Sequence, residues 1–133
     1  MEEPRRRRVL LVEDDDGVRT CLAQVLSEAG FHPVATGDPA EALRAAAQEP
    51  FDAVVCDQNL PGTTGLKLLR AFAGVRPELV SRFVLATGDR TDEEARRFAA
   101  LRPERTLFKP FANDDLLAAV AGVVDGPRAL TAR

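Results

Sequence analysis

The sequence predicts an α/β fold, in which a parallel sheet of five strands carries helices on both faces. Short apolar runs alternate five times with amphipathic stretches along the 133 residues. Consecutive apolar positions are typical of parallel strands that are buried on both sides. The length fits one compact domain. We expect this domain over residues 9–125, between a basic N-terminal tail at 1–8 and a C-terminal tail at 126–133.

The first strand is expected at Val9–Val12, where four apolar residues stand side by side. Apolar residues at helical spacing between Val18 and Ala29 then predict a helix, and Gly30 supplies its C-terminal stop. A weaker apolar run at 31–35 is the second strand.

The second helix has a strong start signal. Asp38 is expected to cap it, and Pro39 occupies the first helical position, where a missing N–H costs nothing. Glu41 stands where a capping box requires an acid. We expect this helix to continue to Gln48.

The rest of the chain repeats the alternation. The third strand, 51–56, leads directly into Asp57. The helix at 92–101 is charged on most faces, so we expect it to be largely exposed. The other predicted elements are helices at 66–72 and 113–124 and strands at 82–86 and 106–108.

Strand–helix alternation of this kind predicts right-handed crossovers between parallel strands. A common arrangement of five such units is the flavodoxin-like strand order 2-1-3-4-5. In that order the functional crevice lies at the carboxyl ends of strands one and three, where the direction of winding reverses.

Composition excludes several classes of protein. The net charge of −3 gives no general affinity for nucleic acid. No apolar run approaches the ~20 residues of a membrane span, and no signal peptide is recognisable, so we expect a cytoplasmic protein without membrane insertion. Cys21 and Cys56 lack metal-binding spacing, and both are expected to be buried.

Chemically active side chains follow four of the predicted strands. Glu13 and Asp14 follow the first strand, Asp57 the third, Thr87 the fourth and Lys109 the fifth. Carboxylates held close together repel one another unless a cation offsets them, and Mg²⁺ prefers oxygen ligands of this kind. A hydroxyl and an ammonium group are suitable donors to phosphate oxygens. The set suits an acyl phosphate formed on a carboxylate nucleophile.

Four segments together resemble the signature of response-regulator receiver domains, the family of chemotaxis-regulator-like proteins. They are VLLVEDD at 9–15, VVCDQNLPG at 54–62, VLATGD at 84–89 and LFKPF at 107–111. A single acidic pair is weak evidence, but four motifs in order are specific. The resemblance extends from Val9 to Val124.

The resemblance implies two-component phosphorelay signalling. Asp57 would accept a phosphoryl group from a histidine kinase or a histidine phosphotransfer protein, in a reaction that needs Mg²⁺. Among the implied metal ligands, Asp14 and Asp57 bind directly, Glu13 acts through water, and Asn59 offers its backbone carbonyl.

The remaining implied roles concern the phosphoryl oxygens and the output. Thr87 and Lys109 would bind these oxygens, and the peptide bond before Pro110 would be cis. Thr87 would move inward on phosphorylation and change the surface near the fourth helix and fifth strand. The implied protein is a phosphoacceptor switch rather than an enzyme, a monomer or weak homodimer, and its partner is an output protein or an attached domain.

Two departures from the family pattern concern the output face. Thr106 stands where many receivers carry an aromatic residue that swings inward on phosphorylation. The segment 99–105 also lacks the Gly-Ala turn that is common before the fifth strand. Both features resemble receivers attached to hybrid histidine kinases.

Two other interpretations remain open. A haloacid-dehalogenase-like phosphatase would use Asp14 as nucleophile and Asp16 as the second acid, so it would lose activity on Asp14→Asn and keep it on Asp57→Asn. A degenerate receiver would only bind partners, but the intact set of acids, threonine and lysine argues against it. Asp15 and Asp16 are expected to begin the first helix rather than bind metal.

Overall fold

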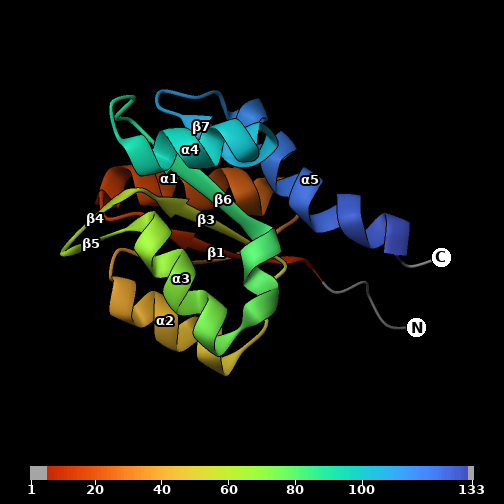
Figure 1. Ribbon diagram of the computed structural model, residues 1–133. Helices are drawn as coiled ribbons and strands as arrows, with labels where there is room; N and C mark the ends of the chain where they lie inside the picture. The colour runs from red at the N-terminus through yellow and green to blue at the C-terminus, as the bar shows by residue number, and fades with distance from the viewer. Residues whose placement is uncertain (1–5, 132–133) are drawn as a thin grey trace, which may run out of the picture.

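The computed structural model describes the backbone of residues 6–131 and the side chains of residues 6–125. Its main sheet has five parallel strands in the order β2-β1-β3-β6-β7 (Figure 1). They are β1 (Arg8–Val12), β2 (His32–Thr36), β3 (Ala53–Asp57), β6 (Phe83–Thr87) and β7 (Thr106–Phe108). The predicted order 2-1-3-4-5 is therefore confirmed.

Helices cover both faces of this sheet. On one face lie α1 (Asp16–Glu28) and α5 (Asn113–Thr131), and on the other α2 (Pro39–Gln48), α3 (Gly65–Val75) and α4 (Glu93–Leu101) (Figure 1). Successive residues of β1 point alternately into the two layers. Val9 and Leu11 belong to the core beneath α1 and α5, whereas Leu10 and Val12 belong to the opposite core. This two-sided burial explains why the strands are apolar at consecutive positions.

Several short elements lie where only loops were expected. A hairpin of β4 (Asn59–Leu60) and β5 (Thr63–Thr64) follows β3, and Gly62 takes a φ of +73° at its turn. Two 3-10 helices, η1 (Pro77–Arg82) and η2 (Pro103–Arg105), precede β6 and β7. Each begins with a proline, whose fixed φ suits the first position of a helical turn. Elements of this length show no hydrophobic period in the sequence.

The helix starts are close to those predicted. Asp15 caps α1 and accepts a hydrogen bond from the Val18 N–H at 2.9 Å. Asp38 caps α2, but Glu41 does not close the expected capping box. Instead, the Thr36 hydroxyl accepts from the Asp38 N–H and donates to Glu41. The predicted capping box is wrong in detail, because Thr36 from the preceding strand lies between Asp38 and Glu41.

Other differences concern the surface and the two ends. Cys56 is buried as expected, but Cys21 is exposed, because α1 packs on the sheet through Leu22 and Leu26. The final helix does not end at Val124, since α5 continues to Thr131. Proline has a φ compatible with a helix, although it lacks the N–H donor, so the Gly-Pro pair at 126–127 was a weaker stop than expected.

The predicted N-terminal and C-terminal tails stay a prediction. Residues 1–5 and 132–133 lie outside the described residues, and β1 already begins at Arg8. No helix in the described part of the chain is both long and apolar enough to cross a membrane.

Candidate functional site

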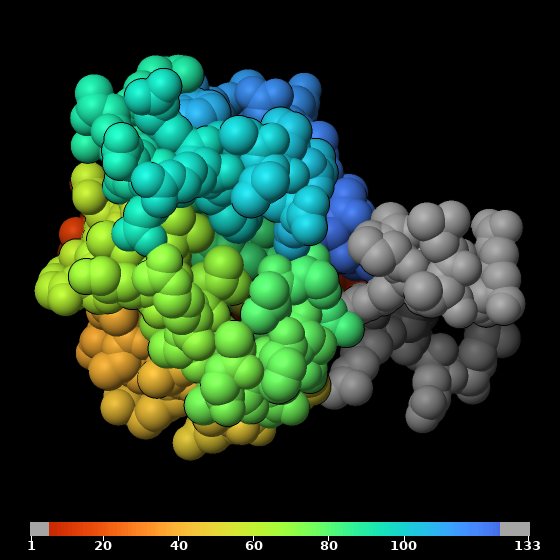
Figure 2. Space-filling view, viewed as in Figure 1, coloured from red at the N-terminus to blue at the C-terminus, as the bar shows by residue number. Residues whose placement is uncertain are grey.

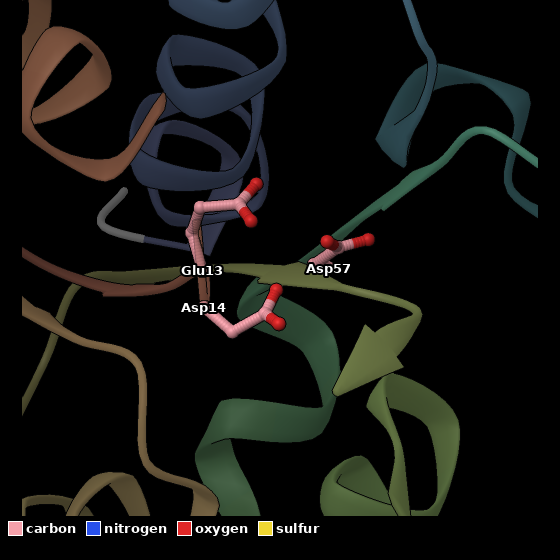
Figure 3. A group of neighbouring side chains, drawn as sticks. All are labelled: Glu13, Asp14 and Asp57. Atoms are coloured by element: carbon pink, nitrogen blue, oxygen red, sulfur yellow. The ribbon is translucent and has the colours of Figure 1, made fainter. Parts of the chain in front are cut away.

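Three carboxylates meet at the carboxyl edge of the sheet. Glu13 and Asp14 directly follow β1, and Asp57 ends β3, which pairs with β1 in parallel. One oxygen from each lies within 4.8 Å of the others (Figure 3). Glu13 and Asp57 are 3% and 6% exposed, whereas Asp14 is exposed to solvent. Residues more than forty positions apart in sequence thus form one acidic cluster because their strands are neighbours.

Lys109 places a positive charge between two of these acids. Its Nζ donates to Glu13 Oε1 and to Asp57 Oδ2, each at 3.0 Å. Burial raises the pKa of Glu13, and the hydrogen bond from Lys109 offsets only part of this effect. Burial alone would lower the pKa of Lys109, but its bonds to the two carboxylates outweigh burial and raise it. The lysine is therefore positively charged at neutral pH.

Thr87 lies at the same edge, at the end of β6. It is 1% exposed, and its neighbour Ala86 is the register partner of Asp57. The Thr87 hydroxyl accepts from the Asp89 N–H at 3.3 Å and donates to the Asp89 carbonyl at 3.5 Å. Both bonds are longer than typical hydrogen bonds. The hydroxyl is therefore held weakly and can exchange the Asp89 carbonyl for a better acceptor.

The lysine is fixed to the same strand. The Lys109 N–H donates to the Thr87 carbonyl at 2.8 Å, and the peptide bond between Lys109 and Pro110 is cis. Gly88 leaves the space beside the lysine side chain open, since an added Cβ would come only within 3.7 Å of Lys109 Cβ. Four predicted site residues, Asp14, Asp57, Thr87 and Lys109, therefore converge at one edge.

Asn59 and Asp16 differ in their relation to the cluster. The Asn59 N–H donates to Asp57 Oδ1 at 3.2 Å, so this residue borders the acidic cluster, with its side chain exposed. Asp16 lies outside the acidic cluster: it is the first residue of α1, its side chain is 90% exposed, and it pairs with Arg19. The second acid that a dehalogenase-like phosphatase needs is therefore missing from the site, which disfavours that interpretation.

Sequence reasoning missed Gln58, which follows β3 directly after Asp57. It is only 2% exposed, and its side chain joins two other elements. Oε1 accepts from the Leu66 N–H at the start of α3 at 3.0 Å, and Nε2 donates to Asp92 Oδ2 at 3.1 Å. A glutamine after a strand is an ordinary turn residue in sequence, so no local pattern distinguishes it.

The comparison with known families agrees with this geometry. The model of the response regulator receiver domain matches residues 9–121, which is most of the chain. The chain belongs to this receiver family. It is thus a receiver domain of two-component response regulators, as the four sequence motifs predicted.

Similar receiver proteins differ greatly in length. The response regulator receiver protein CpdR of Brucella abortus is 32% identical, over 84% of this chain and 91% of that protein. The response regulator protein FleR of Pseudomonas aeruginosa is 38% identical, over 86% of this chain but 24% of that protein. The chain therefore spans nearly all of one relative and about a quarter of the other.

A solved structure supports the same fold. The signal receiver domain of an HD domain-containing protein from Pseudomonas fluorescens superimposes with a TM-score of 0.82 at 27% identity. The match covers 100% of this receiver and 97% of that chain. The flavodoxin-like fold class is confirmed, whereas the likeness to receivers of hybrid histidine kinases stays a prediction.

Proposed function

We propose that this receiver accepts a phosphoryl group on Asp57 from the phosphohistidine of a histidine kinase or a histidine phosphotransfer protein, with Mg²⁺ bound beside it. The observation that supports this most directly is the position of the Asp57 carboxylate. It is largely buried, bonded at 3.0 Å to the Lys109 ammonium, and within 4.8 Å of the Glu13 and Asp14 carboxylates. A nucleophile, a phosphate-binding cation and a set of metal-ligating acids therefore share one site.

The residues present fit a bound Mg²⁺. Three carboxyl groups lie together, and among the contacts of this cluster a single cationic side chain, Lys109, faces them. All the ligand atoms are oxygens, which Mg²⁺ prefers. Asp14 and Asp57 would hold the ion directly, Glu13 through water and Asn59 through its carbonyl. Bound Mg²⁺ would reduce the repulsion between the acceptor and the incoming phosphoryl group.

The protein groups then serve the transfer itself. An oxygen of Asp57 forms a bond to phosphorus as the bond from phosphorus to the histidine nitrogen breaks, and the imidazole leaves with the electron pair. Lys109 stabilises the charge on the transferred group from its position at 3.0 Å. Thr87 gives up its long bonds to Asp89 and donates to a phosphoryl oxygen. This makes the domain a phosphoacceptor switch rather than an enzyme.

Phosphorylation acts on other proteins through a surface of this domain. The new charge shifts an existing equilibrium and alters the region of α4 and β7, where an output protein or an attached domain binds. We propose that the domain acts in the cytoplasm as a monomer or weak homodimer, without direct contact with nucleic acid. The free thiols of Cys21 and Cys56 agree with a reducing compartment.

Labelling with acetyl phosphate tests the acceptor. In the presence of Mg²⁺, the intact mass is expected to increase by one phosphoryl group. The adduct should be acid-labile, so acid treatment should reverse the increase. Asp57→Asn should remain unlabelled because an amide cannot form the acyl phosphate. Absence of an adduct on the wild-type chain, under conditions that label another receiver, would contradict the proposal. Labelling that persists in Asp57→Asn but disappears in Asp14→Asn would favour the phosphatase mechanism instead.

Metal binding is tested separately with Asp14→Asn. We expect this change to lower the affinity for Mg²⁺ by at least about tenfold, because it removes a charged oxygen ligand. Titration calorimetry suits the measurement, since the chain has no tryptophan or tyrosine to report binding by fluorescence. Asp16→Asn is the matched control, because Asp16 is 90% exposed and lies outside the acidic cluster. Equal losses in the two variants would mean that general surface charge, not this cluster, binds the ion.

A further inference from the structure

Gln58 connects the acceptor strand to three other elements. Its backbone N–H donates to the Ala86 carbonyl of β6 at 2.8 Å, and its carbonyl accepts from the Gly65 N–H of α3 at 3.0 Å. Its side-chain carbonyl accepts from Leu66, and its side-chain amide donates to Asp92, the cap of α4. The residue next to Asp57 is thus fixed on β3, β6 and α3, and its amide reaches across to α4.

The Asp92 carboxylate divides its two oxygens between two partners. Oδ1 accepts from the Ala95 N–H and caps α4, whereas Oδ2 accepts from Gln58 at 3.1 Å. The helix that it begins is short and mostly exposed, with Ala95 as its one fully buried residue. Besides the bond to Gln58, its first turn is held by an ion pair between Glu94 and Arg70 of α3 at 2.6 Å, which is exposed and therefore stabilises little. Because Gln58 is buried and Asp92 is charged, their bond is one of the stronger ones.

The loop from Gly88 to Thr91 joins Thr87 to this cap. When the Thr87 hydroxyl leaves Asp89 for a phosphoryl oxygen, the loop loses two bonds and becomes free to shift. The shift is passed on to Asp92, whose N–H donates to the Asp89 carbonyl. Gln58 cannot follow, since its other bonds hold it on β3, β6 and α3. The bond between Gln58 and Asp92 therefore opposes the movement of α4.

The other end of α4 is fixed by a different contact. The Thr106 hydroxyl donates to the carbonyl of Arg102, just beyond α4, at 2.9 Å. Thr106 has no aromatic ring that could enter the space beside Thr87. In this chain the contacts at the N-terminal end of α4 therefore remain as the link between this helix and the acidic cluster. Figure 2 shows that α3 and α4, the two helices that Gln58 contacts, form adjoining parts of one exposed face.

We infer that Gln58 is a positioning residue that holds α4 in its unphosphorylated place through Asp92, so that phosphorylation of Asp57 must break this bond to move the output face. The inference rests on the proposed function of Asp57. It also assigns the coupling between Asp57 and α4 to the residue that directly follows β3.

The test uses Asp92→Ser, which separates the two roles of this carboxylate. Serine still caps a helix through one oxygen but offers no second carboxylate oxygen to Gln58. Beryllofluoride, a mimic of the aspartyl phosphate, serves as the probe with Mg²⁺ in titration calorimetry. We expect Asp92→Ser to bind it about tenfold more tightly, because the restraint on the resting state is lost. Asp38→Ser, the same substitution at the cap of α2, should leave the affinity unchanged.

Hydrogen–deuterium exchange gives an independent measurement. Without beryllofluoride, the α4 peptide should exchange faster in Asp92→Ser and in Gln58→Met than in the wild type. The double variant should exceed neither single variant by much, since both remove the same bond. With beryllofluoride, the wild-type peptide should approach the rate seen in the variants.

The outcomes separate the two proposals. Unchanged or weaker beryllofluoride binding in Asp92→Ser, or unchanged α4 exchange in both single variants, would overturn the role of Gln58. If the wild type itself failed to bind beryllofluoride, the proposed role of Asp57 would be contradicted. The exchange of α4 in the resting variants would still decide whether Gln58 restrains that helix.

Discussion

Lys109→Met is expected to slow phosphoryl uptake from acetyl phosphate by about a hundredfold to a thousandfold. Methionine keeps an unbranched stem but has no charge and no donor. The lost ammonium lies 3.0 Å from both Glu13 and Asp57, and it is the positive side chain that contacts both of them. Without it, these carboxylates repel each other and the incoming phosphoryl oxygens. The initial rate of the mass increase at saturating Mg²⁺ measures the effect.

The chain provides a matched control, because Lys67 is its only other lysine. Lys67 is exposed on α3, where it has no contact with the acidic cluster among the described interactions. Lys67→Met should therefore be labelled at the wild-type rate. Wild-type rates in both Lys67→Met and Lys109→Met would exclude Lys109 from the reaction, whereas equal slowing of both variants would point to an effect of net charge alone.

Much of the fold could be predicted because strong hydrophobic patterns determine it. Consecutive apolar residues in β1 predicted burial on both sides, and the two cores confirm that alternate residues face opposite layers. The handedness of the connections then limits the possible strand orders, and 2-1-3-4-5 is a common one for five strand–helix units. Since parallel strands share one carboxyl edge, residues as distant as Asp14 and Lys109 could be placed together from sequence alone. The acidic cluster and the bridging lysine confirm that placement.

What could not be predicted depends on contacts between side chains that no periodic pattern encodes. The exposure of Cys21 depends on how α1 is rotated on the sheet, and its apolar spacing left more than one rotation open. The role of Gln58 depends on the cap of α4, 34 residues further along. The Thr36 hydroxyl, which bonds to both Asp38 and Glu41 at the start of α2, is a contact of the same kind. In each case the sequence contains the participants but not their distances.

Gly65→Ala should lower the free energy of unfolding by about 1–3 kcal/mol. A Cβ built at this position lies 2.6 Å from the carbonyl oxygen of Asp57 and 3.2 Å from the Cα of Gln58. Both contacts are with backbone, so no flexible side chain can relieve them. Either α3 moves away or the end of β3 does, and the second movement displaces the acceptor carboxylate. Urea denaturation followed by circular dichroism measures the loss of stability.

Gly74→Ala, in the same helix, isolates this steric cause. Nothing lies within 4 Å of a Cβ added there, so the change should stabilise the protein by about 0.5–1 kcal/mol through the higher helix propensity of alanine. Because a Cβ at position 65 would press on the backbone of Asp57, Gly65→Ala should also slow labelling by acetyl phosphate under conditions where the variant is fully folded. A Gly65→Ala protein as stable as Gly74→Ala would show that α3 and β3 are not in close contact. Normal labelling of a destabilised Gly65→Ala would mean that α3 yields and that the position of Asp57 is fixed by the sheet alone.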